Sequence, residues 1–231
     1  MNVAIIPARG GSKRIPKKNI KKMKGLPIIA WTIRSVIKSG IFDRVIVSTD
    51  SNQIANISKK YKAETPFTRP KNLSSDYTVT SAVIKHAIKW LEANNCNPEN
   101  ICCIYPTSAS ISSKDLKKGL KKLKSNKFNY VFSVQKNNNN IFRSFKKDNK
   151  GNLKMIFPQN YKKRTQDLGS VYNDAGQFYW AKTKTWLKKE NIFSGKSSLV
   201  EIPRHKTVDI DTIEDWKLAE KIHVINHNEK K

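Results

Sequence analysis

The segment from Pro7 to Asn19 carries the residues best suited to chemistry, Pro-Ala-Arg-Gly-Gly-Ser-Lys-Arg-Ile-Pro-Lys-Lys-Asn. Adjacent glycines let a backbone approach a ligand and direct its N–H groups inward, and the cations supply positive charge. We therefore predict an anionic, polyphosphate ligand. The pattern is not a P-loop, because no Gly-Lys-Ser/Thr closes it, and it lacks the dinucleotide-binding spacing. The alternative is a solvated, lysine-rich loop.

A second candidate for chemistry is Asp209-Ile210-Asp211. In an extended segment both carboxylates share one face and Ile210 points toward the core. Two like charges side by side favour a cation between them, and carboxylates with phosphate oxygens are common Mg²⁺ ligands. The alternative is that Asp211 or Thr212 only caps the helix that follows.

Alternating apolar strands and amphipathic helices are expected to position these residues. Strands are predicted at 3–6, 44–48, 101–105, 130–134, 176–180 and 207–211, and helices at 26–38, 51–61, 80–93, 113–124, 183–189 and after Thr212. This order predicts an α/β fold with a doubly wound, mostly parallel, Rossmann-like sheet. Ligands of such sheets bind at the carboxyl ends of the strands, where both candidates lie. Phosphate and Mg²⁺ in one site predict attack on a nucleotide α-phosphate with pyrophosphate leaving.

The alternation breaks between about 135 and 170. Segments 141–145 and 153–157 flank Asp148-Asn-Lys-Gly151, which predicts a β-hairpin that acts as a lid or a dimer contact. We therefore expect a single domain over 1–225, an inserted hairpin element at about 136–170, and a frayed tail at 226–231. Ser113 is predicted to cap the helix over 113–124, and Thr212 with Asp215 to form a capping box.

Composition limits the class of protein. The chain has 231 residues, a formal charge of +27 and 38% hydrophobic residues, which suits one sizeable core. It has no long apolar run and no signal-peptide pattern, so a cytoplasmic protein without membrane contact is expected. Cys102 and Cys103 lie in an apolar strand and are predicted to be core residues. Nucleic-acid binding is the alternative from another functional class, but the lysines are scattered and no zinc-finger or RNA-binding motif is present.

Several motifs, in order over about residues 3–222, resemble the acylneuraminate cytidylyltransferases, the CMP-sialic acid synthetase family. They are Ala4 to Asn19, Phe42 to Asp50, Arg69-Pro70 before Leu73-Ser-Ser-Asp76, Tyr105-Pro-Thr-Ser108 and Asp209 to Trp216. Cys102 to Tyr105, Arg164 to Leu168, Asp174 to Trp180 and Pro203-Arg-His205 resemble the pseudaminic acid branch. The resemblance implies transfer of CMP from CTP to the anomeric hydroxyl of a nonulosonic acid, with Mg²⁺ as cofactor and pyrophosphate as product. It also implies a homodimer formed through the hairpin, and a role in glycosylation of flagellin or surface polysaccharide.

The same resemblance assigns roles to residues. The nucleotide-binding set is Arg9, Gly10, Gly11, Ser12, Lys13, Lys18, Asn19, Arg69 and Asp76. The catalytic set is Lys18, Arg9 and Asp211, and the metal set is Asp209 and Asp211. The sugar-binding set is Tyr105, Thr107, Arg164, Gln166, Asp174, Gln177 and Phe178.

A purely structural role is the alternative for the predicted sugar contacts. In the strand Phe178-Tyr-Trp180, for example, about half of the side chains must face the core. The sequence departs from the family at Ala109-Ser110-Ile111, where a proline is usual, and at Asn173, where the branch has histidine. These departures leave N-acetylneuraminic and legionaminic acids open as alternative sugars. An inactive homologue that senses sugar or acts as a scaffold is a further alternative.

Overall fold

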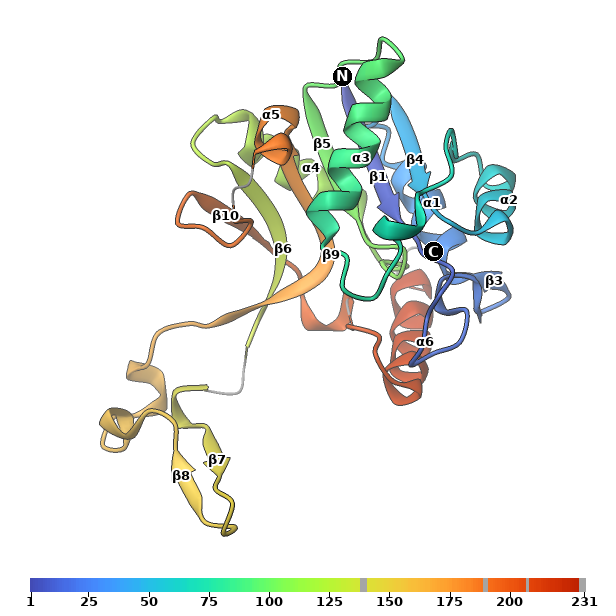
Figure 1. Cartoon of the computed structure of the whole chain (residues 1–231). Coiled ribbons are helices and arrows are strands. Elements are labelled where there is room, and N and C mark those ends of the chain that lie inside the picture. The colour runs from blue at the N-terminus through green and yellow to red at the C-terminus, as the bar shows by residue number, and fades with distance from the viewer. Residues whose placement is uncertain (138–140, 189–190, 207, 229–231) are drawn as a thin grey trace.

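The computed structural model describes residues 1–137, 141–188, 191–206 and 208–228, with the side chains of 226–228 excepted. A six-stranded sheet of order β10-β6-β9-β5-β1-β4 forms the centre of the molecule (Figure 1). Its strands are β1 (Asn2–Pro7), β4 (Arg44–Ser48), β5 (Asn100–Ile104), β6 (Tyr130–Lys136), β9 (Tyr172–Lys182) and β10 (Ser197–Glu201). β9 pairs antiparallel with β5 and β6, and the other pairings are parallel. The predicted α/β fold with a mostly parallel sheet is confirmed.

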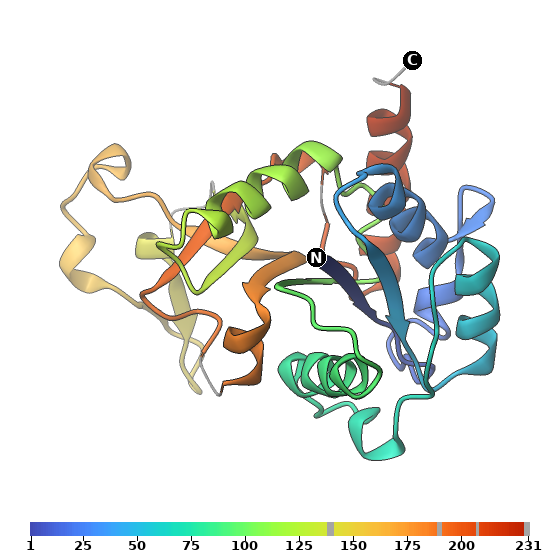
Figure 2. The same cartoon turned by 90° about the horizontal axis from the view of Figure 1, so that it is seen from above.

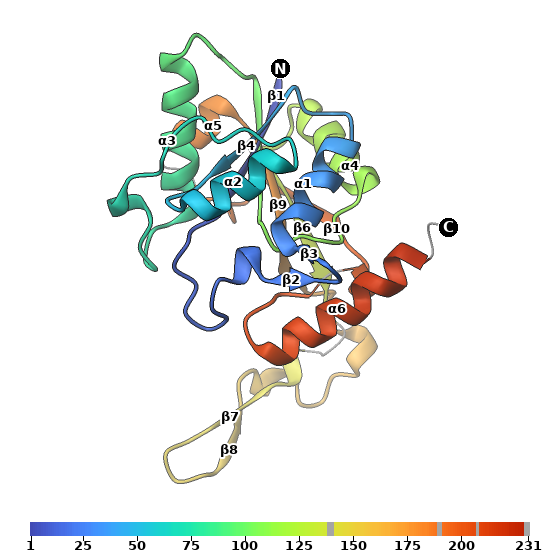
Figure 3. The ribbon, with the colours of Figure 1, turned by 90° about the vertical axis from the view of Figure 1, so that its right-hand side faces the viewer.

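Helices cover both faces of the sheet, as Figures 2 and 3 show. They are α1 (Ile28–Lys38), α2 (Asn52–Lys60), α3 (Thr80–Ala93), α4 (Ser113–Lys124), α5 (Thr183–Leu187) and α6 (Ile213–Asn228). Within β1, Ala4 and Ile6 pack on the side of α1 and α4, whereas Val3 and Ile5 pack on the side of α3 and α5. Strands buried on both faces explain the continuous apolar runs in the sequence.

The first turns of two helices differ from the sequence expectation. Ser112, rather than Ser113, is the N-cap of α4, because its hydroxyl accepts a hydrogen bond from the backbone N–H of Asp115. The helix predicted from residue 26 begins two residues later. Leu26–Pro27 instead forms β3, which pairs with β2 (Lys22–Met23) in a small antiparallel ladder.

A long arm leaves the sheet between β6 and β9 and projects away from the body of the molecule (Figure 1). At its base the backbone N–H of Asn137 donates to the carbonyl oxygen of Val171 at 2.8 Å. The hairpin within it pairs β7 (Phe145–Lys147) with β8 (Leu153–Met155). The first hairpin strand therefore starts at Phe145 rather than 141, because Ile141–Arg143 forms a 3₁₀ turn.

The C-terminal part corrects two further predictions. Residues 208–211 form no strand, and residue 207 lies outside the described residues. The last strand of the sheet is instead β10, a short edge strand that the sequence pattern did not predict. The final helix continues through Asn228, and residues 229–231 of the predicted frayed tail lie outside the described residues.

A third apolar cluster joins α6 to the glycine-rich segment. Ile15, Ile28, Ala109, Ile210 and Trp216 pack together in it. Ile210 is 2% exposed while its aspartate neighbours are not buried, so the predicted alternation holds without a strand. This cluster therefore attaches both chemical motifs to the same end of the sheet.

Among the described residues, no helix is both long enough and apolar enough to cross a membrane.

Candidate active site

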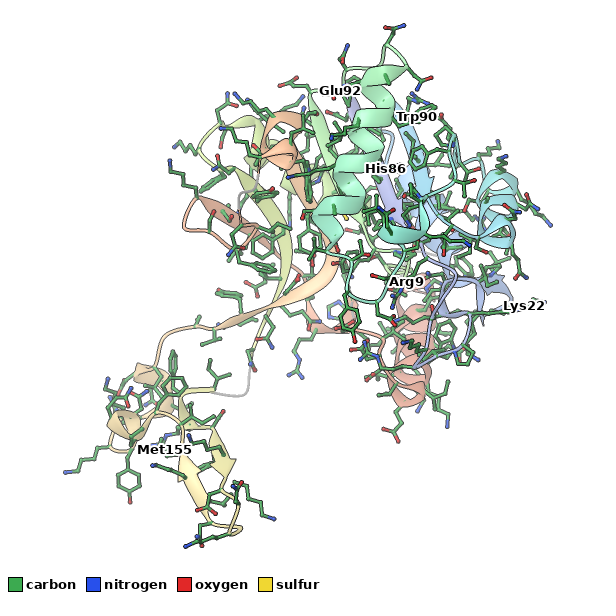
Figure 4. The ribbon with its side chains drawn as sticks, viewed as in Figure 1. Arg9, Lys22, His86, Trp90, Glu92 and Met155 are labelled. Carbon is green, nitrogen blue, oxygen red and sulfur yellow. The ribbon has the colours of Figure 1, made fainter. Side chains whose placement is uncertain are left out.

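The glycine-rich segment lines a cavity of about 630 Å³ beyond the carboxyl ends of β1 and β5. Its other walls come from the 69–83 segment, which leads into α3, and from Tyr105, Pro106 and Thr107 after β5. The cavity brings together most of the predicted nucleotide-binding residues and two of the predicted sugar-binding residues: Arg9, Ser12, Lys13, Lys18, Asn19, Arg69, Asp76, Tyr105 and Thr107. Figure 4 shows Arg9 at this end of the molecule, beyond the N-terminal end of α3.

Two of the loop cations contact one carboxylate. Arg9 Nη1 lies 2.5 Å from Asp76 Oδ1, and Lys13 Nζ lies 2.6 Å from Asp76 Oδ2. Hydrogen bonding by Lys13 and then by Arg9 holds the pKa of Asp76 below its usual value. Asp76 is therefore anionic at neutral pH and balances part of the charge of the loop.

Lys18 lies beside the aspartate pair. Its Nζ donates to the carbonyl oxygen of Ile210 at 2.6 Å and lies 3.8 Å from Asp211 Oδ1. Burial lowers the pKa of Lys18, and Asp211 and Asp209 oppose that shift. Arg14 Nη1 lies 2.8 Å from Asp211 Oδ2. The structure thus places both predicted catalytic cations and Asp211 at one end of the sheet.

The two aspartates have a donor set that fits a hard divalent cation. Their carboxylates flank buried Ile210, and the pKa of Asp209 is raised by partial burial and then by Asp211. A cation would relieve this repulsion, and carboxylate oxygens are suitable Mg²⁺ ligands. Among the described residues there is no group of three or more His, Cys, Asp or Glu side chains placed to hold a metal. Any ion at Asp209 and Asp211 would therefore need ligands from substrate or water.

Arg69 is a buried cation facing the cavity. Its side chain is 4% exposed, its Nη2 lies 3.9 Å from Asp50 Oδ1, and burial lowers its pKa. Nε and Nη2 have no hydrogen-bond partner among the described residues. Buried guanidinium donors without partners are costly, so they are suited to a ligand atom in the cavity.

Gly10 and Gly11 do not line the cavity, and only Gly10 is closely packed against another segment. Gly10 N donates to Asp50 Oδ1 at 2.8 Å, and a Cβ at Gly10 would lie 3.2 Å from Ser51 Cβ. Asn19 is 6% exposed and donates to the carbonyl oxygen of Arg9 at 2.9 Å. Gly11 has open space at its Cβ position.

Tyr105 connects the cavity to β9. Its hydroxyl lies 3.1 Å from Thr80 Oγ1, and its ring centroid lies 5.4 Å from that of Tyr179. Tyr179 donates a short hydrogen bond to Asp174. Asp174 therefore lies behind Tyr105 rather than in the cavity wall, and Gln177 is also buried, at 3% exposure.

Besides Asp174 and Gln177, three more predicted sugar-binding residues lie outside the cavity. Phe178 is fully buried and packs in the cluster on the α4 side of the sheet, so in this structure it is a core residue. Arg164 and Gln166 lie on the arm, where Arg164 pairs with Asp167 at 3.0 Å. The departures from the family pattern also lie outside it, because Ala109 is buried beside α6 and Asn173 is exposed on β9.

Sequence reasoning missed the contacts of Arg14, Asp50 and Thr80. Arg14 lies within the cationic segment and Asp50 lies two residues after the end of β4, and both are in motifs already singled out. A fuller reading of strand ends could have found them. Thr80 carries no such signal, because its role depends on where Tyr105 lies.

The chain belongs to the cytidylyltransferase family, whose sequence profile matches residues 3–230. It is 40% identical over 226 residues to a pseudaminic acid cytidylyltransferase of Campylobacter jejuni subsp. jejuni serotype O:2, covering 98% of this chain and 97% of that protein. A CMP-N,N'-diacetyllegionaminic acid synthase of Legionella pneumophila is 31% identical over 235 residues, covering 97% of each. The structure of a CMP:2-keto-3-deoxy-manno-octonic acid synthetase complexed with CTP shares the fold, with a TM-score of 0.71, 14% identity and 99% coverage of both chains.

Proposed function

We propose that this protein transfers CMP from CTP to the anomeric hydroxyl of pseudaminic acid and releases pyrophosphate. The observation that carries the proposal is the single cavity in which the loop cations, buried Arg69 and Tyr105 converge beside Asp211. Relatives named pseudaminic acid cytidylyltransferases at 40% and 39% identity support this sugar over the neuraminic and legionaminic alternatives.

The charge and burial of each residue in the site indicate its role in the reaction. Arg9, Ser12 and Lys13 hold the triphosphate with charge-assisted hydrogen bonds. Half-buried Lys18 stabilises the charge that develops as pyrophosphate leaves, and this effect is larger than it would be in water. Arg69 and Asn19, which line the same cavity, provide donors for the nucleoside. Asp209 and Asp211 would hold Mg²⁺, which supplies Lewis-acid charge neutralisation.

The proposed sugar contacts of Arg164 and Gln166 depend on a second copy of the chain. Both residues lie on the arm, which extends away from the cavity of its own chain (Figure 1). Exposed apolar side chains on that arm, Phe145 at 60% and Leu153 at 74%, support a homodimer in which they are covered. In such a dimer, the arm of one copy would bring these side chains to the other copy's cavity.

The test is pyrophosphate release from CTP and Mg²⁺ with pseudaminic, N-acetylneuraminic or legionaminic acid at equal concentration. We expect release with pseudaminic acid and at least about tenfold less with the others. Preference for another sugar would keep the reaction and refute the substrate. Release with none, together with salt-dependent DNA retention, would favour nucleic-acid binding. Sugar binding without turnover would favour an inactive homologue.

A further inference from the structure

The carboxylate of Asp76 lies between Arg9 and Lys13, where a phosphate group of the proposed nucleotide would bind. It uses one carboxylate oxygen for Arg9 at 2.5 Å and the other for Lys13 at 2.6 Å, and all three side chains line the same cavity. Phosphate oxygens make the same charge-assisted contacts with the same donors. A nucleotide that engages both cations fully must therefore compete with Asp76.

The segment that carries Asp76 is lightly attached to the rest of the protein. Residues 74–79 lie between a 3₁₀ turn at Lys71–Leu73 and α3, and Tyr77 is 95% exposed and Val79 63% exposed. Its internal contacts are local, such as the 2.9 Å hydrogen bond between Ser75 Oγ and Thr78 Oγ1. Few buried contacts make a segment easy to displace.

A different carboxylate shows the contrast. Asp50 also faces the loop, but its Oδ1 accepts the Gly10 N–H at 2.8 Å and it lies two residues after the end of β4, so it belongs to the rigid part of the site. Asp76, in contrast, comes from an exposed segment, and its carboxylate pairs with the side chains of Arg9 and Lys13. Of the two, Asp76 is the one that can leave without disturbing the sheet.

We propose that Asp76 is an internal counter-ion, which pairs Arg9 and Lys13 in the free enzyme and is displaced when the phosphates of a nucleotide bind. This inference rests on the proposed function for the identity of the nucleotide. It changes the role of Asp76 from nucleoside recognition, which the sequence predicted, to competition for the phosphate site. Pairing would also keep the two cations in the cavity before substrate arrives.

The test is titration of inorganic pyrophosphate and of CTP, without sugar, into wild type, Asp76→Asn and Glu92→Gln. Glu92→Gln makes the same charge change on an exposed residue at the far end of α3 (Figure 4). We expect Asp76→Asn to bind both ligands about three- to tenfold more tightly than wild type, because two exposed ion pairs no longer compete. Glu92→Gln should match wild type. Equal or weaker binding of either ligand by Asp76→Asn would overturn the proposal.

Hydrogen exchange of wild type provides a test that needs no variant. Pyrophosphate should speed amide exchange in residues 74–79, because the segment loses its two ion pairs. Slower exchange would mean that the segment closes over the ligand, which would refute displacement. Neither measurement requires turnover or sugar, so the proposal can fail while CMP transfer stands, and the reverse is also possible.

Discussion

At the scale of single residues, Lys18 is a partly buried cation whose Nζ lies 3.8 Å from Asp211 Oδ1. Replacing it with alanine removes charge that matters most in the transition state. We expect Lys18→Ala to lower kcat and kcat/KM together, by about 10²-fold or more. Steady-state kinetics with CTP and pseudaminic acid measure this effect.

Lys22→Ala is the matched control, because Lys22 is exposed on β2 and is not part of the cavity wall (Figure 4). It should keep wild-type rates. An increase in KM with unchanged kcat in Lys18→Ala would restrict Lys18 to ground-state binding.

Asp211 connects the cationic loop to the proposed Mg²⁺ site. Asp211→Asn removes one of the two carboxylates, so we expect it to bind Mn²⁺ at least about tenfold more weakly than wild type. Electron paramagnetic resonance in the presence of CTP measures this affinity. The CMP transfer activity of Asp211→Asn should fall below that of wild type, and excess Mg²⁺ should restore it only in part. Glu214→Gln changes the same charge on an exposed residue of α6 and should bind Mn²⁺ like wild type. Unchanged Mn²⁺ affinity in Asp211→Asn would remove this residue from the metal set.

At the scale of elements, α4 packs unusually closely on β9 at Gly119. A Cβ there would lie 2.7 Å from Trp180 Cδ1 and 3.0 Å from Phe178 Cε2. The Trp180 ring cannot easily shift, because it is fully buried and stacks on Phe42 with ring centroids 5.1 Å apart. Overpacking of a core lowers stability by about 1–3 kcal/mol. Alanine has a helix propensity that is roughly 1 kcal/mol more favourable than that of glycine, which offsets only part of this cost.

We therefore expect Gly119→Ala to lower the free energy of unfolding by up to about 2 kcal/mol, measured by urea denaturation. Lys117→Ala on the exposed face of α4 should change it by less than about 0.5 kcal/mol. A Gly119→Ala protein more stable than wild type would contradict this prediction and show that α4 can shift away from β9 without loss of stability.

The elements also show what sequence patterns can and cannot predict. Strands β1, β4 and β5 were predicted because burial on both faces leaves an unbroken apolar run. β10, Ser-Ser-Leu-Val-Glu, was missed because an edge strand with one fully buried residue lacks that signal. The alternation in β9 was visible, but only the packed structure assigns Phe178 and Trp180 to the α4 side and Tyr179 to the other.

The site was predicted to a similar depth. Arg9, Lys13 and Lys18 lie in one motif and line one cavity, and their contacts with phosphate stay a prediction from residue type and order. The pairing of Asp76 with Arg9 and Lys13 was not predicted, because it depends on the path of a separate loop. The position of Arg164 depends on how far the arm projects, which local sequence does not encode.

At the scale of the whole molecule, the arm presents apolar side chains that the body of its own chain does not cover. Phe145, Leu153, Ile156 and Tyr161 are between 47% and 74% exposed. Exposed apolar side chains gathered on a projecting element are typical of an association surface, and a second copy of the arm is the partner expected here. The assignment of Arg164 to the sugar pocket requires the same association.

Leu153→Asp tests both consequences, because it places a charge on the apolar face of the hairpin. We expect wild type to be a dimer and Leu153→Asp a monomer in light scattering after size exclusion, since an unpaired charge in such an interface is strongly unfavourable. Lys154→Ala lowers the net charge by the same amount on the opposite face of β8 and should remain dimeric. The monomer should keep wild-type affinity for CTP, because the nucleotide contacts lie within one chain, and should lose kcat/KM for the sugar. A monomeric variant with full sugar turnover would separate dimer formation from catalysis and remove Arg164 from the sugar site.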